Sequence, residues 1–359
     1  MKCMKKLSDL LILMMISSVL AGITGCSTVG YYSQALSGQV DVLSRRESIE
    51  MLVDDPKTNE ELRHRLANIV KAREFAVNTL HLPDSASFTS YADVGRPFVI
   101  WNVFATPELS LKQKQWCHIF IGCFSYRSYF SEDGARTYAD ELEQEGYDVY
   151  VGGVAAYSTL GWFEDPVYNT MMRYSDTEMA GILFHELAHE VIYVDDDTAF
   201  NESFAMAVQL EGTRKWLEHI NEPEAFKAYK QDQQRDEEFV SYIMQYRKQL
   251  EKMYALDISD EARRKGKTEI FKALRENYKQ LKASWNGYKG YDNWFKRKLN
   301  NATLAPIGTY HHYVPAFVAL LKKQGGNFTR FYEAANEIAR MPKKKREQTM
   351  KLLVKVPTD

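Results

Sequence analysis

The sequence is poor in the residue types that most often reveal chemistry. Its 359 residues include only eight histidines and four cysteines, and the formal net charge is -2. A chain so close to neutral gives no electrostatic reason to expect nucleic acid or an acidic substrate as its partner. We also find no internal repeat and no long linker. Because 45% of the residues are hydrophobic and 26% are charged, a well-packed globular protein is expected, in which any cluster of the few histidines is informative.

An apolar run near the N-terminus extends from Leu10 to Ala21 and follows three lysines at positions 2, 5 and 6. This pattern is typical of a secretory signal and is too short for a membrane-spanning helix. The next residues, Ile23-Thr24-Gly25-Cys26, resemble the lipobox of bacterial lipoproteins. The alternative is a plain signal peptide cleaved nearby.

The lipobox resemblance implies that residues 1–25 are a lipoprotein signal peptide and that Cys26 becomes the acylated N-terminus. In the sorting rule that comes with this resemblance, Ser27 at the next position favours the outer membrane. We therefore expect a lipid-anchored protein of the bacterial cell envelope, on the periplasmic face of the outer membrane. Only the acyl chains attach this protein to its partner, the membrane, and the folded part lies in water.

Export also determines how the other cysteines are interpreted. Cys3 leaves with the signal peptide and Cys26 takes lipid, so Cys117 and Cys123 remain as a pair in an oxidising compartment. A metal site is the alternative, but the five intervening residues, with only His118 nearby, make a poor zinc knuckle. We therefore predict a structural disulfide that closes a short loop.

The remaining pattern predicts an α+β fold in one domain, residues 46–359, after a polar tether at residues 26–45. Its β-containing front covers residues 85–165, and its helical back covers residues 176–345. Within this domain the pattern predicts helices over 59–80 and 131–146, the second capped by Ser131, and a strand over 147–151. The strand ends at Gly152-Gly153, where another backbone could approach closely, or which could form a bulge or turn. Near the C-terminus, the basic run Lys343 to Arg346 is interpreted as a solvated helix end.

The stretch HELAHEVIYVDDDTAFNESFA, residues 185 to 205, contains the pattern HExxH. On a helix, His185 and His189 project from one face about one turn apart, so both can bind one zinc ion. Glu186 lies beside the metal, where it can take a proton from zinc-bound water. A chance match in a chain of this length has a probability on the order of 1%. The surrounding helix is apolar, so two imidazoles and a carboxylate would be costly to bury unless a metal paired them. A structural pair of core histidines is the alternative.

Catalytic zinc usually has three protein ligands, so a third must be found. A tight turn directly after the HExxH helix could bring Asp195 to the metal, but it would need a glycine at position 192. That position is Ile192, so Asp195 is a weak candidate. The polar break at residues 195–198 instead predicts a second helix, capped by Asp197 or Thr198. Glu202 in the first turns of this helix can point back at the histidines. Its alternative role is a partner of the helix dipole. Glu190 points to another side and is expected to be solvated or to support the ligands.

HExxH on one helix and a glutamate ligand on the next resembles the gluzincins, the group that includes thermolysin and aminopeptidase N. More narrowly, several segments resemble a bacterial family of zinc aminopeptidase lipoproteins, whose activity name itself rests largely on the motif. Apart from the lipobox, these segments lie between Trp116 and Glu202. They are Trp116-Cys117, Gly122-Cys123, Val151-Gly152-Gly153-Val154, Ala156-Tyr157-Ser158-Thr159-Leu160-Gly161-Trp162-Phe163 and Phe200-Asn201-Glu202. The resemblance implies a zincin-like fold and a peptide or protein substrate.

Zinc peptidases also need a group that stabilises the oxyanion formed on the scissile carbonyl. The segment from Thr309 to Pro315 is rich in suitable side chains, with Tyr310 as first choice and His311 as second. Its alternative role is a polar loop before a helix.

Substrates of zincins generally pair with an edge strand, and residues 154–161, after the glycine pair, are the candidate. The candidate substrate-binding residues are Gly153, Ala156, Tyr157 and Ser158. A buried strand is the alternative there.

The sequence therefore predicts a peptidase with one Zn²⁺ per chain, bound by His185, His189 and Glu202. Glu186 is its general base, and Tyr310 or His311 stabilises the transition state. The family resemblance implies an aminopeptidase, although the GAMEN motif of aminopeptidase N is absent, and an endopeptidase is the nearest alternative. A non-catalytic envelope lipoprotein with a structural metal site is the alternative from another class, but such a site would not require Glu186.

Overall fold

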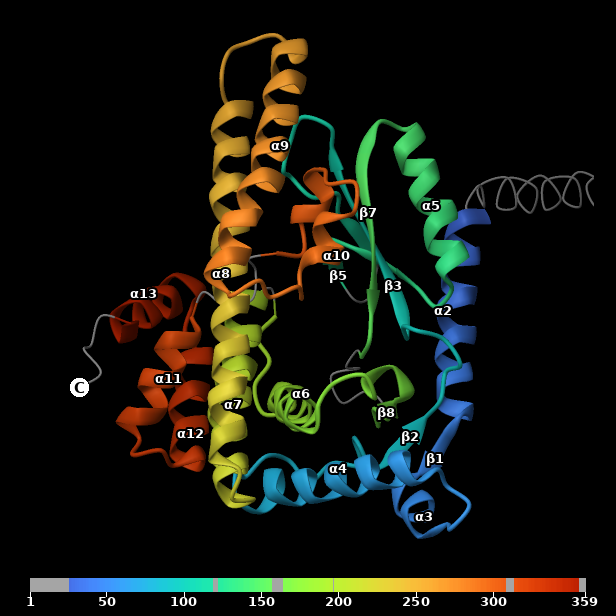
Figure 1. Cartoon of the computed structure of the whole chain (residues 1–359), viewed down its shortest axis with the longest axis vertical. Helices are drawn as coiled ribbons and strands as arrows, with labels where there is room; N and C mark the ends of the chain where they lie inside the picture. Colours follow the sequence, from blue (N-terminus) through green and yellow to red (C-terminus); the bar gives the residue numbers. More distant parts are fainter. Residues whose placement is uncertain (1–25, 119–121, 157–163, 196, 308–312, 355–359) are drawn as a thin grey trace, which may run out of the picture.

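The computed structural model describes residues 26–118, 122–156, 164–195, 197–307 and 313–354. The small sheets lie mostly in the N-terminal half of the chain, and the C-terminal half is helical (Figure 1). This arrangement confirms the predicted α+β class. Among the described residues, no helix has the length and apolar character that crossing a bilayer requires.

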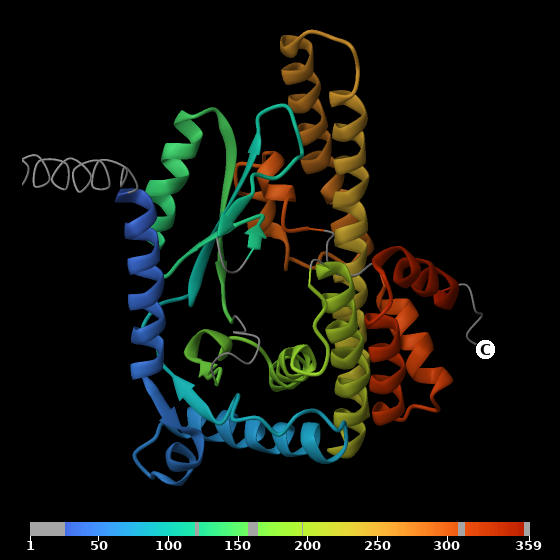
Figure 2. The same ribbon diagram turned by 180° about the vertical axis from the view of Figure 1, so that it is seen from behind.

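The polar tether expected at residues 26–45 is instead a packed helix, α2 (Cys26–Ser44). Its Gln34 side chain donates to the carbonyl oxygen of Ser128 at 3.2 Å and accepts from the amide of Phe130 at 3.1 Å. Val42, near its end, is completely buried. Figures 1 and 2 both show α2 alongside α5. The segment is therefore a helix held to the rest of the protein by Gln34 and Val42, although several of its other residues are exposed.

In the described part of the β-rich region, the strands form three small sheets rather than one. The first has the order β1-β2-β8, with β1 (Arg46–Ser48) antiparallel and β8 (Val167–Tyr168) parallel to β2 (Ser90–Ala92). The second, antiparallel throughout, has the order β6-β3-β7, from β3 (Ile100–Pro107), β6 (Arg127–Tyr129) and β7 (Tyr147–Val154). The third is the hairpin of β4 (Trp116–His118) and β5 (Gly122–Phe124).

Helix α5 (Glu132–Gln144) covers one face of the β6-β3-β7 sheet. The Ser131 hydroxyl accepts from the amide of Gly134 at 3.2 Å, which confirms the predicted N-cap. The buried residues of α5, such as Leu142, pack against Trp101 and Val103 of β3. Strand β7 thus begins where predicted, directly after this helix, and continues to Val154.

The main core lies among the helices that surround α6 (Asp176–His189) and α7 (Thr198–His219). They are α3 (Ile49–Asp54), α4 (Glu60–Asn78), α11 (Val314–Lys323), α12 (Phe328–Ala339) and α13 (Lys343–Val354). Phe204 of α7, for example, stacks on Phe331 of α12 with ring centroids 5.6 Å apart. In Figures 1 and 2, α6 lies between α4 and the β6-β3-β7 sheet, with α7 beside it.

A long helical hairpin, α8 (Pro223–Tyr254) and α9 (Asp260–Ser284), projects from this core (Figure 1). It has its own apolar cluster with α10 (Asp292–Phe295), in which the rings of Tyr278 and Phe295 stack 3.8 Å apart. Two 3-10 turns complete the fold, Asn169–Met171 before α6 and η2 (Asn301–Leu304) beside β7.

Candidate metal centre

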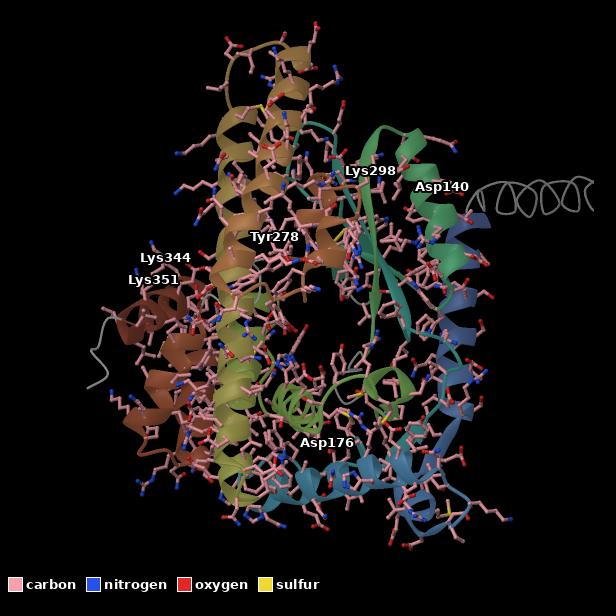
Figure 3. All side chains as sticks on the ribbon, in the orientation of Figure 1. Asp140, Asp176, Tyr278, Lys298, Lys344 and Lys351 are labelled. Atoms are coloured by element: carbon pink, nitrogen blue, oxygen red, sulfur yellow. A yellow bond between two sulfur atoms is a disulfide. The ribbon has the colours of Figure 1, made fainter. Side chains whose placement is uncertain are left out.

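Helix α6 begins with a complete capping box. The Ser175 hydroxyl accepts from the amide of Glu178 at 3.2 Å, and the Ser175 amide donates to the Glu178 carboxylate at 2.7 Å. Asp176 in the first turn accepts from the Asn68 side chain of α4 at 2.7 Å, and Figure 3 shows this end of α6 beside α4. The apolar residues of α6 are buried in the main core, so its register is fixed along the whole length.

Helices α6 and α7 pack closely, because a Cβ atom added at Gly181 would lie only 3.1 Å from the hydroxyl of Thr213. The first turn of α7 is capped by Asp197, which accepts from the amide of Phe200 at 3.2 Å. This confirms the predicted second helix and its cap. The Asn201 side chain then bonds to both backbone groups of Val194, each at 2.9 Å. Val194 is thereby held against the start of α7.

Three side chains converge where α6 and α7 meet. The Nε2 atoms of His185 and His189 lie 3.2 Å apart. The Oε2 atom of Glu202 lies 3.3 Å from the first and 3.7 Å from the second. The exposed fractions of the three side chains are 15%, 6% and 24%, so the centre is largely shielded from water. The predicted ligands are therefore brought together by the fold.

These spacings fit a metal ion. Ligands about 2.0–2.2 Å from a tetrahedral zinc ion lie about 3.3 Å from one another, close to the separations of the three atoms. The Nδ1 atoms of His185 and His189 are buried and have no hydrogen-bond partner among the described residues. Two imidazoles with their Nε2 atoms turned toward one carboxylate are an electron-rich donor set, which needs a cation or protons at its centre.

The charges of the group are consistent with cation binding. Burial raises the pKa of Glu202, but hydrogen bonds to His185 and His189, and their charges, outweigh it and lower that pKa to about 2. Burial lowers the pKa of His185, but the hydrogen bond to Glu202 and the negative charge of Glu186 raise it above its ordinary value. Without a metal, the raised pKa of His185 favours a proton on this imidazole beside the Glu202 carboxylate, and a divalent cation would displace that proton.

The other acidic residues near the motif have different surroundings. Glu186 is half-buried, next to His185 in sequence, and its charge acts on that imidazole. Glu190 accepts from the Ser85 hydroxyl at 3.2 Å and is not part of the converging group found in the described residues. Asp195 is exposed and is not part of the converging group found in the described residues. Among the carboxylates considered for the third ligand, the geometry thus favours Glu202.

Strand β7 is an edge strand of the β6-β3-β7 sheet, and its Gly153 pairs with Trp101 of the neighbouring strand β3. A Cβ atom at Gly153 would lie 2.3 Å from the ring of Phe98. The close approach at this glycine is thus made by a side chain, not by another backbone as expected. Ala156 follows the strand and packs against the main core. The other candidates, Tyr157, Ser158, Tyr310 and His311, lie outside the described residues.

The predicted disulfide between Cys117 and Cys123 is present, and the two cysteines face each other across the β4-β5 hairpin. Shortly after this hairpin comes Tyr126, whose ring packs 5.8 Å from that of Phe104. Burial, and next the charge of Glu202, raises the pKa of Tyr126. Its protonated phenol is therefore within electrostatic reach of the metal ligands. Sequence reasoning missed this residue, because no spacing links the hairpin to α7.

The fold and the site define an α+β protein in which two adjacent helices place two imidazoles and one carboxylate where they could hold a metal ion. The model of the family described as "Putative aminopeptidase" matches residues 30–350. Because this match covers most of the chain, the protein belongs to that family, which supports a peptidase-like function at a general level. No curated protein matches the chain, and no solved structure does.

Proposed function

We propose that this protein is a zinc-dependent peptidase, with aminopeptidase action as the first candidate activity. The observation that carries the proposal is the convergence of His185, His189 and Glu202, with Glu186 beside them on α6. The family match supports peptide hydrolysis, and its description supports the aminopeptidase assignment. One Zn²⁺ ion per chain fits the nitrogen and oxygen ligands and their spacing.

The chemistry that zinc supplies in such a site is polarisation of the scissile carbonyl and acidification of a water molecule. In our proposal, Glu186 acts as the general base. Its carboxylate accepts a proton as water adds to the carbonyl carbon, and then delivers that proton to the leaving amine when the C–N bond breaks. Glu202 and the two histidines hold the cation in position. Their fixed placement on two packed helices limits the reorganisation that the reaction requires.

A peptide substrate would extend along β7. The carbonyl oxygen of Val154 accepts from the amide of Val99 at 2.9 Å, so residue 154 faces β3. The alternation of an antiparallel ladder then turns the backbone groups of Val151 and Gly153 away from β3, toward a side where the described residues place no strand. Asn300 already donates to the outward carbonyl of Val149 at 2.8 Å. As far as the described residues extend, the edge is therefore free after Val149, which supports β-addition of a peptide there.

For the oxyanion we retain Tyr310 and His311 as candidates. Support comes from Tyr313, the first described residue after them, whose amide donates to the Ser203 hydroxyl at 3.0 Å. Ser203 is the neighbour of Glu202 on α7, so the chain leaves this segment next to a metal ligand.

We further propose that the protein is attached to the envelope by lipid on Cys26, on the periplasmic face of the outer membrane. The lipobox-like sequence before Cys26 supports this proposal. Peptides or proteins of that compartment would be the substrates. Mass spectrometry of the protein from membranes, compared with a Cys26→Ala variant, tests the anchor. A wild-type N-terminal peptide without acyl groups would refute it.

The catalytic role is tested with the soluble domain, starting after Cys26, as wild type and Glu186→Gln. Both proteins should retain zinc, and only the wild type should cleave a peptide mixture, because the amide cannot accept the proton. If both retain zinc and are equally inert, the site is a structural metal site; equal activity would remove Glu186 from the mechanism. Peptides with free or acetylated N-termini then separate an aminopeptidase from an endopeptidase, since only an endopeptidase should cleave the acetylated series.

A further inference from the structure

The last helix of the chain contains one buried basic residue. The run Lys343 to Arg346 was interpreted as a solvated helix end, but Arg346 is only 5% exposed. Figure 3 shows Lys344 and Lys351 of the same helix at the surface of the molecule. The Nη1 atom of Arg346 donates to the carbonyl oxygens of Ala339 at 3.1 Å and Met341 at 2.9 Å. Arg346 is thereby fixed to the end of α12 and to the link between α12 and α13.

The rest of the guanidinium reaches the start of α7. Its Nε and Nη2 atoms lie 2.8 Å and 2.7 Å from Oδ2 of Asp197, and each of the two side chains is 6% exposed. The other carboxylate oxygen, Oδ1, caps α7 by accepting from the amide of Phe200. The guanidinium also lies over the ring of Phe200, 5.4 Å from its centroid. One carboxylate therefore joins α13 to the first turn of α7.

Glu202 lies in the next turn of α7. The neighbours on each side are tied to other parts of the fold, Asn201 to Val194 and Ser203 to Tyr313. The position of the Glu202 carboxylate relative to His185 on α6 thus depends on where α7 begins. A buried ion pair adds little net stability when compared with apolar residues, but removing one partner leaves a costly buried charge.

We propose that Arg346 and Asp197 form a positioning pair, by which the C-terminal helix α13 holds the start of α7 and places Glu202 at the metal centre. This inference rests on the proposed metal site but not on peptide hydrolysis. Neither residue touches the ligands; both act through the backbone of α7. Within α13, Arg346 is therefore the residue that helps to complete the site.

The first test is the zinc affinity of the soluble domain, measured by competition with a chromophoric chelator. Arg346→Met should weaken zinc binding by about tenfold or more, as loss of a supporting group does at other sites. Arg346→Lys should recover part of this loss, and the exposed control Lys344→Met should leave the affinity unchanged. The double variant Asp197→Asn/Arg346→Met should bind better than Arg346→Met, because asparagine keeps the cap and removes the unpaired charge. Wild-type affinity in Arg346→Met would overturn the proposal.

The second test uses the metal-free protein, so it remains decisive even if the wild type binds no zinc. Glu202→Gln should lower the urea midpoint in the wild-type background, because the contact with the histidines is lost. In the Arg346→Met or the double-variant background the same substitution should have a clearly smaller effect. An equal effect in these backgrounds would show that Glu202 is positioned without Arg346. Zinc-free wild type with a strong coupling would refute the proposed metal site, and the pair would then position Glu202 only against His185 and His189.

Discussion

Acidification should weaken the metal-free fold through Glu202. The contact with His185 and His189 lowers the pKa of this carboxyl from 4.5 to about 2. At ~1.4 kcal/mol per pKa unit, the lowered pKa corresponds to about 3 kcal/mol of unfolding free energy. Because the folded-state pKa is the lower one, this stability is present above pH 4.5 and is lost as the pH falls through about 2. Near pH 3, roughly half of it should remain.

The opposite limit is set by His185, whose pKa is raised above 6.5 in the folded protein. Its contribution is present below that ordinary value and is lost as the pH rises through the folded-state value. From this pair alone, the metal-free protein should be most stable between pH 4.5 and 6.5.

The assay is urea unfolding of chelator-treated wild type and Glu202→Gln between pH 6 and pH 3. Glu218→Gln serves as a control at an exposed position of the same helix, with the Glu218 side chain 59% exposed. The difference in unfolding free energy between wild type and Glu202→Gln should become smaller as the pH falls. The difference between wild type and the control Glu218→Gln should not change in this way. A difference between wild type and Glu202→Gln that stays constant from pH 6 to pH 3 would refute the reasoning.

Three further outcomes follow from the structure. Zinc affinity should fall as the pH drops through the raised pKa of His185, since the imidazole must lose its proton to bind, and calorimetric titrations at several pH values check this. Replacing Cys117 and Cys123 by serine should lower the unfolding free energy by about 2 kcal/mol, the value for so short a loop, and added reductant should not affect the variant. Gly153→Ala should cost about 1–3 kcal/mol in urea unfolding, because the new methyl group meets the ring of Phe98; an unchanged midpoint would contradict the packing.

Local sequence signals were sufficient for the centre itself. The four-residue spacing of His185 and His189 and the capping residue Asp197 each depend on one stretch of chain, so the metal group could be predicted without tertiary information. The same holds for Ser131 at the start of α5. The disulfide was predictable because the expected export would leave only one pair of cysteines.

What the sequence did not reveal depends on contacts between distant residues. Arg346 is 149 positions from its partner Asp197, so its basic run looked like an ordinary solvated surface. Gln34 forms hydrogen bonds with backbone groups in and next to β6, nearly a hundred residues away. The local sequence of α2 alone does not show these contacts and therefore predicts a polar tether. Phe98 explains Gly153 only once β3 and β7 are paired. In each case tertiary packing decides the structure of a segment whose local pattern is weak.

The proposed metal centre is tested most directly by the zinc content of the purified soluble domain, measured by elemental mass spectrometry. We expect one zinc ion per chain in the wild type and in Glu186→Gln. Much less zinc should remain in His189→Ala and Glu202→Ala. A wild type without bound zinc, or full zinc retention after loss of either ligand, would contradict the proposed metal centre.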